Sequence, residues 1–247
     1  MDFGLTVAGF GVGLLIGLTG VGGGAVMTPL LIVVFQVPPA VAVGTDIVFA
    51  ALTKLVGIWR HWRFGAIRWA VVGRLAVGSL PAALFSLHFL GHLPGPAVEG
   101  LINHLLGLVL VATGLAMMVG RRSRPDTGER DRAWPTVALG AILGALVTLT
   151  SVGAGALGAA VLRWLYPGLP LIAIVGTDIA HAAALTVVAG VGHWGLGDVD
   201  TSLLAILLVG SVPGIILGSR LGVALPEAAI RALLAGVVTL VGVNLVW

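Results

Sequence analysis

The sequence has no cysteine, a single lysine and few charged residues of any kind, which together make up 9% of 247 residues. The absence of cysteine excludes disulfides, thiolate metal sites and thiol redox chemistry. The shortage of charge excludes a soluble domain, because a soluble chain of this length exposes far more charge. The first residues, Met1-Asp2-Phe3, also lack the basic segment that opens a cleavable signal peptide.

The sequence consists mainly of hydrophobic residues instead. Hydrophobic residues make up 58% of it, and the mean hydropathy is +1.13. This composition predicts an all-α polytopic membrane protein with little mass outside the bilayer and no nucleic-acid-binding domain. The formal net charge is +3, and in membrane proteins such positive charge usually marks the cytoplasmic loops.

The chain also repeats itself. Short motifs return after 132 residues, and a glycine cluster returns after 131. Each copy lies in apolar sequence and carries an aspartate, and a duplicated membrane unit with an acid at matching depth is the architecture of many transporters. The matched segments are Val43–Ile47 with Val175–Ile179, His61-Trp62 with His193-Trp194, Val77–Pro81 with Val209–Pro213, and Val21–Gly24 with Val152–Gly155.

The hydrophobic pattern of each half predicts three membrane-spanning helices, which follow a longer interrupted apolar stretch. The stretches 4–36 and 134–165 exceed a single span and are broken by the glycine cluster. We expect each to be a broken helix or a re-entrant hairpin with the glycines at its tip. The expected spans are 39–60, 68–90, 97–120, 171–193, 200–219 and 226–247.

Arginine placement favours hairpins over single broken spans. If both stretches enter and leave on one side, every arginine from Arg60 to Arg231 lies in or near an inside loop. If each stretch crosses once, Arg163, Arg220 and Arg231 fall outside. Hairpins also give each half an odd number of crossings, which predicts two inverted repeats. The predicted units are a first membrane repeat (1–120), a cytoplasmic linker (121–132) and a second membrane repeat (133–247).

Glycines recur every fourth residue in the first arm of each stretch. Gly9, Gly13 and Gly17 form one series, and Gly140 and Gly144 form the other. On a membrane helix this spacing lets neighbouring backbones approach closely, so we interpret both series as packing surfaces.

The glycine clusters at the two tips form a candidate anion site. Consecutive glycines leave backbone amides uncovered, which membranes tolerate only where the backbone is buried in protein or lines a polar cavity. The helix that follows each cluster directs its positive N-terminal end at the tip. The alternative is a kink needed only for packing. The candidate substrate-binding residues are Gly22, Gly23, Gly24, Thr45, Thr150, Ser151, Gly153, Gly155 and Thr177.

Two acids lie at membrane depth. Asp46 and Asp178 are each seven residues inside a predicted span, about 10 Å into a core about 30 Å thick. An acid there is costly and often belongs to a proton relay. The alternative is a structural acid bonded to neighbouring hydroxyls, for which Thr45 and Thr177 are candidates. We predict Asp46, Asp178 and His181 as proton-coupling residues. His181 is included because it follows Asp178 by three residues on the same helix face.

Three other polar residues, Lys54, His61 and His193, lie in or at the ends of the predicted spans. Lys54 lies eight residues after Asp46 and well round the expected helix, so the two cannot pair directly. It could attract an anion, or its ammonium could extend towards the helix end. His61 and His193 each end a span, and we interpret them as anchors at the membrane interface.

Taken together, the motifs resemble the sulfite exporter TauE/SafE family of membrane permeases over nearly the whole chain. The likeness is carried by Gly17–Gly24 followed by Pro29, by the Gly-Thr pairs at 44–45 and 176–177, and by the His-Gly patterns at 61/65 and 193/197. The resemblance implies a multi-pass protein of the bacterial inner membrane that moves sulfite, sulfoacetate or other small anions. Many members have Ser or Asn after the Gly-Thr pair, where this chain has Asp in both copies.

The leading hypothesis is therefore a secondary transporter, an exporter, of a small oxyanion such as sulfite or an organosulfonate. The anion would lie between the tips, with proton coupling and alternating access. The first alternative is a cation or proton pathway through the acid pair. An enzyme is disfavoured, because the chain has no Gly-x-Ser-x-Gly elbow, no His-Glu-x-x-His and no thiol. We expect no cofactor or metal; the partners are the anion, protons and lipid, with a homo-oligomer left open.

Overall fold

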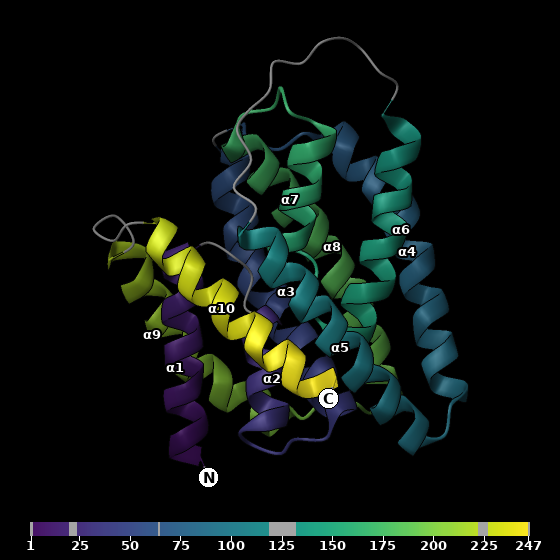
Figure 1. Ribbon diagram of the computed structural model, residues 1–247, viewed down its shortest axis with the longest axis vertical. Helices are drawn as coiled ribbons and strands as arrows, with labels where there is room; N and C mark the ends of the chain where they lie inside the picture. Colours follow the sequence, from purple (N-terminus) through teal and green to yellow (C-terminus); the bar gives the residue numbers. More distant parts are fainter. Residues whose placement is uncertain (1, 20–23, 64, 119–131, 222–226, 247) are drawn as a thin grey trace.

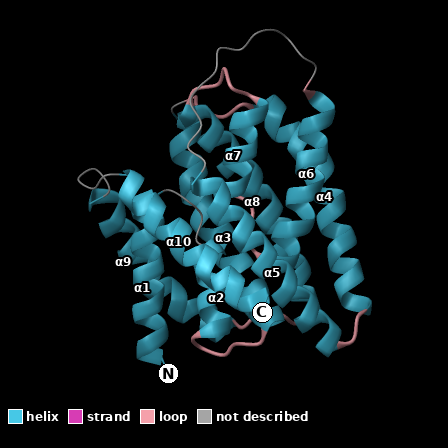
Figure 2. Ribbon diagram, in the orientation of Figure 1, coloured by secondary structure: helices cyan, strands magenta, loops and turns pink. Residues whose placement is uncertain are grey.

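The computed structural model describes residues 2–19, 24–63, 65–118, 132–221 and 227–246. Within them every regular element is an α-helix (Figure 2). Most of the loops that join the helices lie at the two ends of the molecule, whereas the turn between α6 and α7 is buried inside it. The helices are α1 (Asp2–Thr19), α2 (Gly24–Val33), α3 (Pro39–Arg63), α4 (Trp69–His92), α5 (Gly95–Met118), α6 (Ala133–Thr150), α7 (Ala156–Leu165), α8 (Leu171–Leu196), α9 (Thr201–Leu221) and α10 (Glu227–Val246).

The six predicted spans correspond to α3, α4, α5, α8, α9 and α10, with ends that differ by a few residues. In the described part of the chain, α4, α5, α6, α8 and α9 are long and apolar enough to cross a membrane by length and composition. The helix α3 is the least apolar of all, since it carries Asp46, Lys54 and the arginines of its last turn. The helix α6 reaches spanning length although the sequence assigned it to one arm of a broken stretch.

Both interrupted stretches are divided between two helices, as predicted. Between α6 and α7 the chain passes through Ser151, Gly153 and Gly155 with φ angles of 59°, 126° and 118°. These angles lie where L side chains are strained, so a glycine-rich sequence is needed at this turn. The corresponding turn of the first half, residues 20–23, lies outside the described residues.

The two arms of each stretch run back on each other. In Figure 1, α1 begins at the lower edge and the loop after α2 returns to it, whereas α6 begins at the upper edge and the loop after α7 returns there. An aromatic residue closes the base of each hairpin. Phe35 packs on Gly4, and the Tyr166 hydroxyl lies 2.7 Å from Thr136 Oγ1 beneath the Arg132 guanidinium.

Helices of one half pack mainly along helices of the other. The main pairs are α1 with α9, α4 with α6, α3 with α8 and α5 with α10. The first helix of each half therefore lies along the fourth helix of the other half. If the two halves are interchanged, the pair α1 with α9 becomes α6 with α4, and the pairs α3 with α8 and α5 with α10 stay the same.

Glycines carry the closest of these approaches. Gly13 of α1 faces the backbone of Ser211 in α9 so closely that a Cβ would overlap it. Gly144 of α6 faces the backbone of Ser79 in α4 in the same way. The repeat offsets relate Gly13 to Gly144 and Ser211 to Ser79, so the two contacts are equivalent. The predicted packing role of these glycine series is confirmed.

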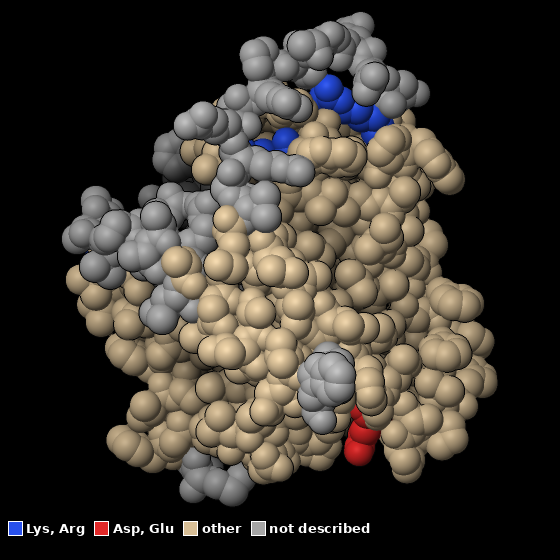
Figure 3. All heavy atoms as spheres, viewed as in Figure 1, with Lys and Arg blue, Asp and Glu red and all other residues tan. Residues whose placement is uncertain are grey.

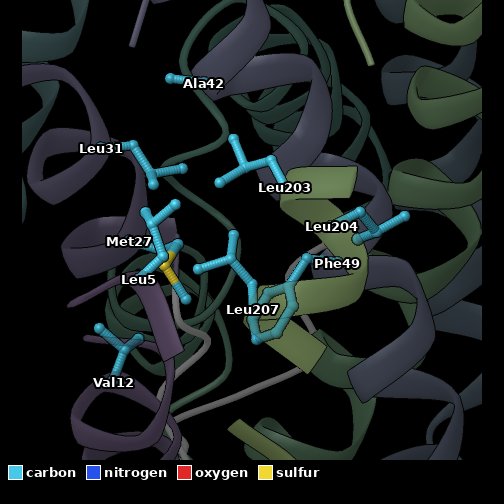
Figure 4. Close-up of a cluster of buried hydrophobic side chains, with 9 residues drawn as sticks. All are labelled: Leu5, Val12, Met27, Leu31, Ala42, Phe49, Leu203, Leu204 and Leu207. Atoms are coloured by element: carbon cyan, nitrogen blue, oxygen red, sulfur yellow. The ribbon is translucent and has the colours of Figure 1, made fainter. Parts of the chain in front are cut away.

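Two apolar clusters position the hairpins. Each holds one hairpin against the long helix that follows it and against one helix of the other half, by dispersion contacts rather than by a drive to leave water. Figure 4 shows the first cluster, in which side chains of α1, α2 and α3 converge on α9. Its members are Leu5, Val12, Met27, Leu31, Ala42, Phe49, Leu203, Leu204 and Leu207, and the second comprises Val71, Leu75, Leu139, Leu143, Leu162 and Ile174.

The exposed charged side chains of one face of the molecule lie towards its two ends. On the face drawn in Figure 3, lysine and arginine lie at the upper end and acidic residues at the lower end. The middle of this face is free of both among the described residues, as expected for a surface that faces lipid.

The close approach at Gly13 predicts a steep effect of one methyl group. We expect Gly13→Ala to lower the free energy of unfolding by about 1–3 kcal/mol, because the added carbon must displace the backbone of Ser211. Equilibrium unfolding in mixed detergent micelles would measure this. Gly11→Ala, on the same helix with nothing within 4 Å of the new Cβ, is the matched control and should be neutral or stabilising. Equal effects of the two changes would contradict the glycine packing surface.

Candidate functional site

Asp46 of α3 is fully buried where the two hairpins meet. Its Oδ2 accepts hydrogen bonds from Thr28 Oγ1 at 2.5 Å and from Ser151 Oγ at 2.9 Å. Thr28 lies on α2, in the hairpin of the same half, whereas Ser151 belongs to the tip between α6 and α7. One carboxylate therefore joins the hairpins of both halves through two charge-assisted bonds.

The backbones of the two hairpins touch beside this carboxylate. Gly24, the first residue of α2, lies against the carbonyl oxygen of Ser151, and a Cβ at Gly24 would overlap that oxygen. Ser151 itself has a left-handed φ of 59°, which directs its hydroxyl towards Asp46. Of the glycines predicted at the tips, Gly24 is thus in direct contact with the opposite half. Gly22 and Gly23 lie outside the described residues.

Asp178 of α8 is equally buried but bonded differently. Its carboxylate interacts with the backbone N–H of Gly155 at the start of α7. Its Oδ1 lies so near Gly158 that a Cβ there would overlap it, and it has no hydrogen-bond partner among the described residues. The repeat equivalent of Thr28 is Ala159, so the hydroxyl donor that Asp46 has on its own hairpin is missing here.

His181 lies one helical turn after Asp178 and is also buried. Its Nε2 is 2.8 Å from Ser79 Oγ in α4, and its Nδ1 has no partner within the described residues. The repeat equivalent of His181 is Phe49, which belongs to the apolar cluster of Figure 4. The second half therefore has a polar side chain where the first half has an apolar one.

Lys54 connects the two acids electrostatically. It is half-buried in α3, and its ammonium interacts with Asp46 and also with Asp178, although it forms no ion pair closer than 4.0 Å with a described residue. Asp46 and Asp178 belong to different halves, so one cation serves both. The sequence correctly separated Lys54 from direct pairing with Asp46 but gave no sign of its interaction with Asp178.

The predicted threonine ligands are engaged with loops of the opposite half. Thr45 Oγ1 accepts the backbone N–H of Asp200 at 3.0 Å, and Thr177 Oγ1 accepts the backbone N–H of Arg68 at 3.0 Å. Asp200 and Arg68 are themselves repeat equivalents, so these contacts form a reciprocal pair. The two hydroxyls hold loops next to the buried acids, and their contact with a substrate stays a prediction.

The remaining predicted residues shape the second tip. Thr150 Oγ1 donates to the carbonyl of Leu146 at 2.6 Å and lies 3.2 Å from the backbone nitrogen of Val152. It thereby closes the last turn of α6, while Gly153 and Gly155 supply the turn into α7.

Sequence reasoning missed Thr28, Ser79 and Gly158. Thr28 is the only polar side chain in the apolar helix α2, which was the available signal. His193, interpreted as an interface anchor, is instead fully buried, and this interpretation was wrong. The side chain of His61 lies outside the description. Among the described residues no group of three or more His, Asp or Glu side chains could hold a metal ion.

Comparison with known proteins gives a consistent family. The family model named Sulfite exporter TauE/SafE matches residues 5–245. The chain is 38% identical to the probable membrane transporter protein YjnA of Bacillus subtilis, with 100% of both chains covered. It is 26% identical to the probable membrane transporter protein MJ0441 of Methanocaldococcus jannaschii, covering 74% of this chain and 66% of the relative. No solved structure matches the chain.

The bonds at Asp46 predict the effect of removing one hydroxyl. Thr28→Val removes one hydroxyl donor from Oδ2 of the buried carboxylate, so we expect the free energy of unfolding to fall by about 1–3 kcal/mol. Thr53→Val is the matched control, because the Thr53 hydroxyl bonds only carbonyls of its own helix. In an Asp46→Ala background the cost of Thr28→Val should shrink to that of the control. An undiminished cost there would show that Thr28 acts elsewhere.

Proposed function

The chain belongs to the sulfite exporter TauE/SafE family of membrane transporters, and from this membership we propose that it moves a small oxyanion across the bacterial inner membrane, coupled to protons. It is a multi-pass membrane transporter and not an enzyme. Sulfite or an organosulfonate is the proposed cargo. The observation that carries the proposal is the meeting of both hairpins at the buried Asp46 carboxylate.

We further propose that residues 1–120 and 133–247 are inverted repeats joined by the linker 121–132. The reciprocal bonds at Thr45 and Thr177 support this, because a two-fold related pair makes each contact twice. The opposite starting edges of α1 and α6 in Figure 1 and the separation of charge in Figure 3 agree with inversion. Repeats arranged in this way would rock about a central site to give alternating access.

The proposed anion site lies between the hairpin tips. The N-terminal end of α7 lies beside Asp178 at Gly155, whereas α2 reaches Asp46 through Thr28 and places its first residue, Gly24, against Ser151. Helix N-termini stabilise negative charge, whether it belongs to a side chain or to a bound anion. An ionised Asp178 therefore competes with an incoming anion for the N-terminal end of α7.

This competition provides a mechanism for proton coupling. Protonation of Asp178 removes its negative charge and frees the Gly155 amide for an oxygen of the substrate. The same reasoning applies at Asp46, where the hydroxyls of Thr28 and Ser151 would turn towards the anion. The anion and the proton then bind together, and Lys54 supplies positive charge within reach of both acids.

A cation or proton pathway is the second candidate. It is favoured by the outer oxygens of the two carboxylates, Asp46 Oδ1 and Asp178 Oδ1, which have no hydrogen-bond partner among the described residues. Such oxygens are ligands for a cation or sites for a proton. The ammonium of Lys54 opposes a metal cation at the same place.

Flux into proteoliposomes of the purified protein distinguishes the candidates. We expect saturable sulfite flux that follows an imposed pH gradient and is reduced by sulfoacetate as a competitor, with sulfate as a third anion for comparison. Proton or sodium flux without flux of any oxyanion would instead support the cation pathway.

Asp178→Asn tests the coupling residue directly. We expect the variant to bind sulfite but to lose the dependence of flux on the pH gradient, because the amide cannot take up a proton. Glu99→Gln removes an exposed acid on α5 and is the matched control, with wild-type coupling expected. Retention of full gradient dependence in Asp178→Asn would remove this residue from the mechanism.

A further inference from the structure

His193 and Asp198 form an acid–base pair at the end of α8. The ring of His193 is fully buried, and its Nδ1 lies 3.0 Å from Oδ2 of Asp198 in the loop between α8 and α9. Its Nε2 lies 2.9 Å from the backbone carbonyl oxygen of Thr148 in α6. Asp198 is partly exposed, so the pair has a route to solvent.

The backbone at the helix end explains why these residues meet. Gly197 has a φ of 83°, its N–H bonds the carbonyl of Trp194 at 3.2 Å, and the N–H of Asp198 bonds the carbonyl of His193 at 3.0 Å. These two bonds form a Schellman motif, which reverses the chain after the last helical turn. The carboxylate of Asp198 is thereby returned to the ring of the histidine five residues earlier.

The hydrogen bonds of the ring require one extra proton. Both ring nitrogens face oxygen atoms, and the carbonyl of Thr148 can only accept. An ionised carboxylate also only accepts, and a neutral imidazole has a single N–H. Both contacts are satisfied by a doubly protonated ring beside an ionised Asp198, or by a neutral ring beside a protonated Asp198. We propose that the His193–Asp198 pair is a proton-binding site of this protein, distinct from the acids at the hairpin tips.

No neighbouring titratable group in the described part of the chain supplies the extra proton, so it must be held by His193 or Asp198. The helix α6 presents the carbonyl of Thr148, and α3 presents Gly44, which packs against the backbone of Asp198. The nearby Asp200 is bonded through Oδ1 to the first N–H groups of α9. Within the described residues no other titratable side chain forms a hydrogen bond or an ion pair with His193.

The first half of the chain lacks this chemistry. Gly65, the equivalent of Gly197, also has a left-handed φ of 61°, but Ala66 stands where the second half has Asp198. The helix end can thus be built without an acid. Asp198 is an addition to the motif, which favours a chemical role over a requirement of the turn.

The pair and its loop also contact α3, which carries Asp46, and α6, which leads to Ser151. Its loop is fixed to α3 at Gly44 and Thr45, immediately before the acid, and its ring bonds α6 three residues before Ser151. Loss of the proton removes one donor, which detaches the ring either from α6 or from the loop. The proton therefore controls a clamp between α3 and the second hairpin. This consequence for transport rests on the proposed function, whereas the proton binding does not.

Solid-state NMR of protein with isotope-labelled histidine and aspartate, in liposomes at neutral pH, counts the proton. His193→Gln identifies the ring signals and Asp198→Asn the carboxyl signal. We expect either both ring nitrogens protonated, or a neutral ring with a protonated carboxyl group; each outcome supports the site. A neutral ring beside an ionised carboxylate would overturn it. In Asp198→Asn the amide can donate to Nδ1, so the contacts persist and His193 should become neutral.

The same variant tests the clamp separately. In proteoliposomes we expect Asp198→Asn to keep sulfite flux but to shift its dependence on pH, because one proton no longer binds. An unchanged pH profile beside a changed NMR proton count would overturn the role in transport. Absence of sulfite flux in the wild type would refute the proposed cargo and leave the NMR result unaffected.

Discussion

The meeting of the two hairpins depends on one constraint: the carboxylate of Asp46 is buried in an apolar protein and needs hydrogen-bond donors. A lone ionised carboxylate away from water is too costly to persist, so an ionised Asp46 needs hydrogen-bond donors. Those donors come from both halves, through Thr28 and Ser151, and the tips must come together to provide them. Contact at this distance leaves no room for a Cβ at Gly24, and it places Ser151 in a left-handed conformation. The glycine-rich sequence of the tips follows from this requirement.

A common frame in the two halves supports different chemistry. The frame consists of glycines against backbone and threonines against loops. The contact of Gly13 with Ser211 has its equivalent at Gly144 and Ser79, and the bond of Thr45 to Asp200 has its equivalent at Thr177 and Arg68. The side chains that differ lie at the acids and at the helix ends. His181 is the repeat equivalent of Phe49, Ala159 that of Thr28, and Asp198 that of Ala66. A duplicated fold needs the frame to close twice, but it needs each polar group only where the proposed proton or anion would bind.

The helices, their breaks and the duplication could be predicted from the sequence, because hydropathy and consecutive glycines act over short distances. The partners of the polar residues could not. Thr45 bonds a backbone amide 155 positions away and His181 bonds a serine 102 positions away, and no local pattern encodes such distances. The burial of His193 was missed for the same reason, since its partner on α6 lies 45 positions earlier. The repeat offset relates Arg68 to Asp200 as it relates Thr45 to Thr177, so either contact, once known, implies the other.

The loops after α3 and α8 connect the frame to the chemistry. Each loop gives a backbone N–H to the threonine that precedes the buried acid of the opposite half. A rigid rotation of one half against the other would therefore stretch these bonds. Of these two loops, as far as the structure describes their residues, the one after α8 carries the proposed proton-holding pair, and it is attached to the half whose acid joins the two tips. Rocking of the halves and movement of a proton would then be opposed by the same few hydrogen bonds, which is how a small change in charge can bias a large change in shape.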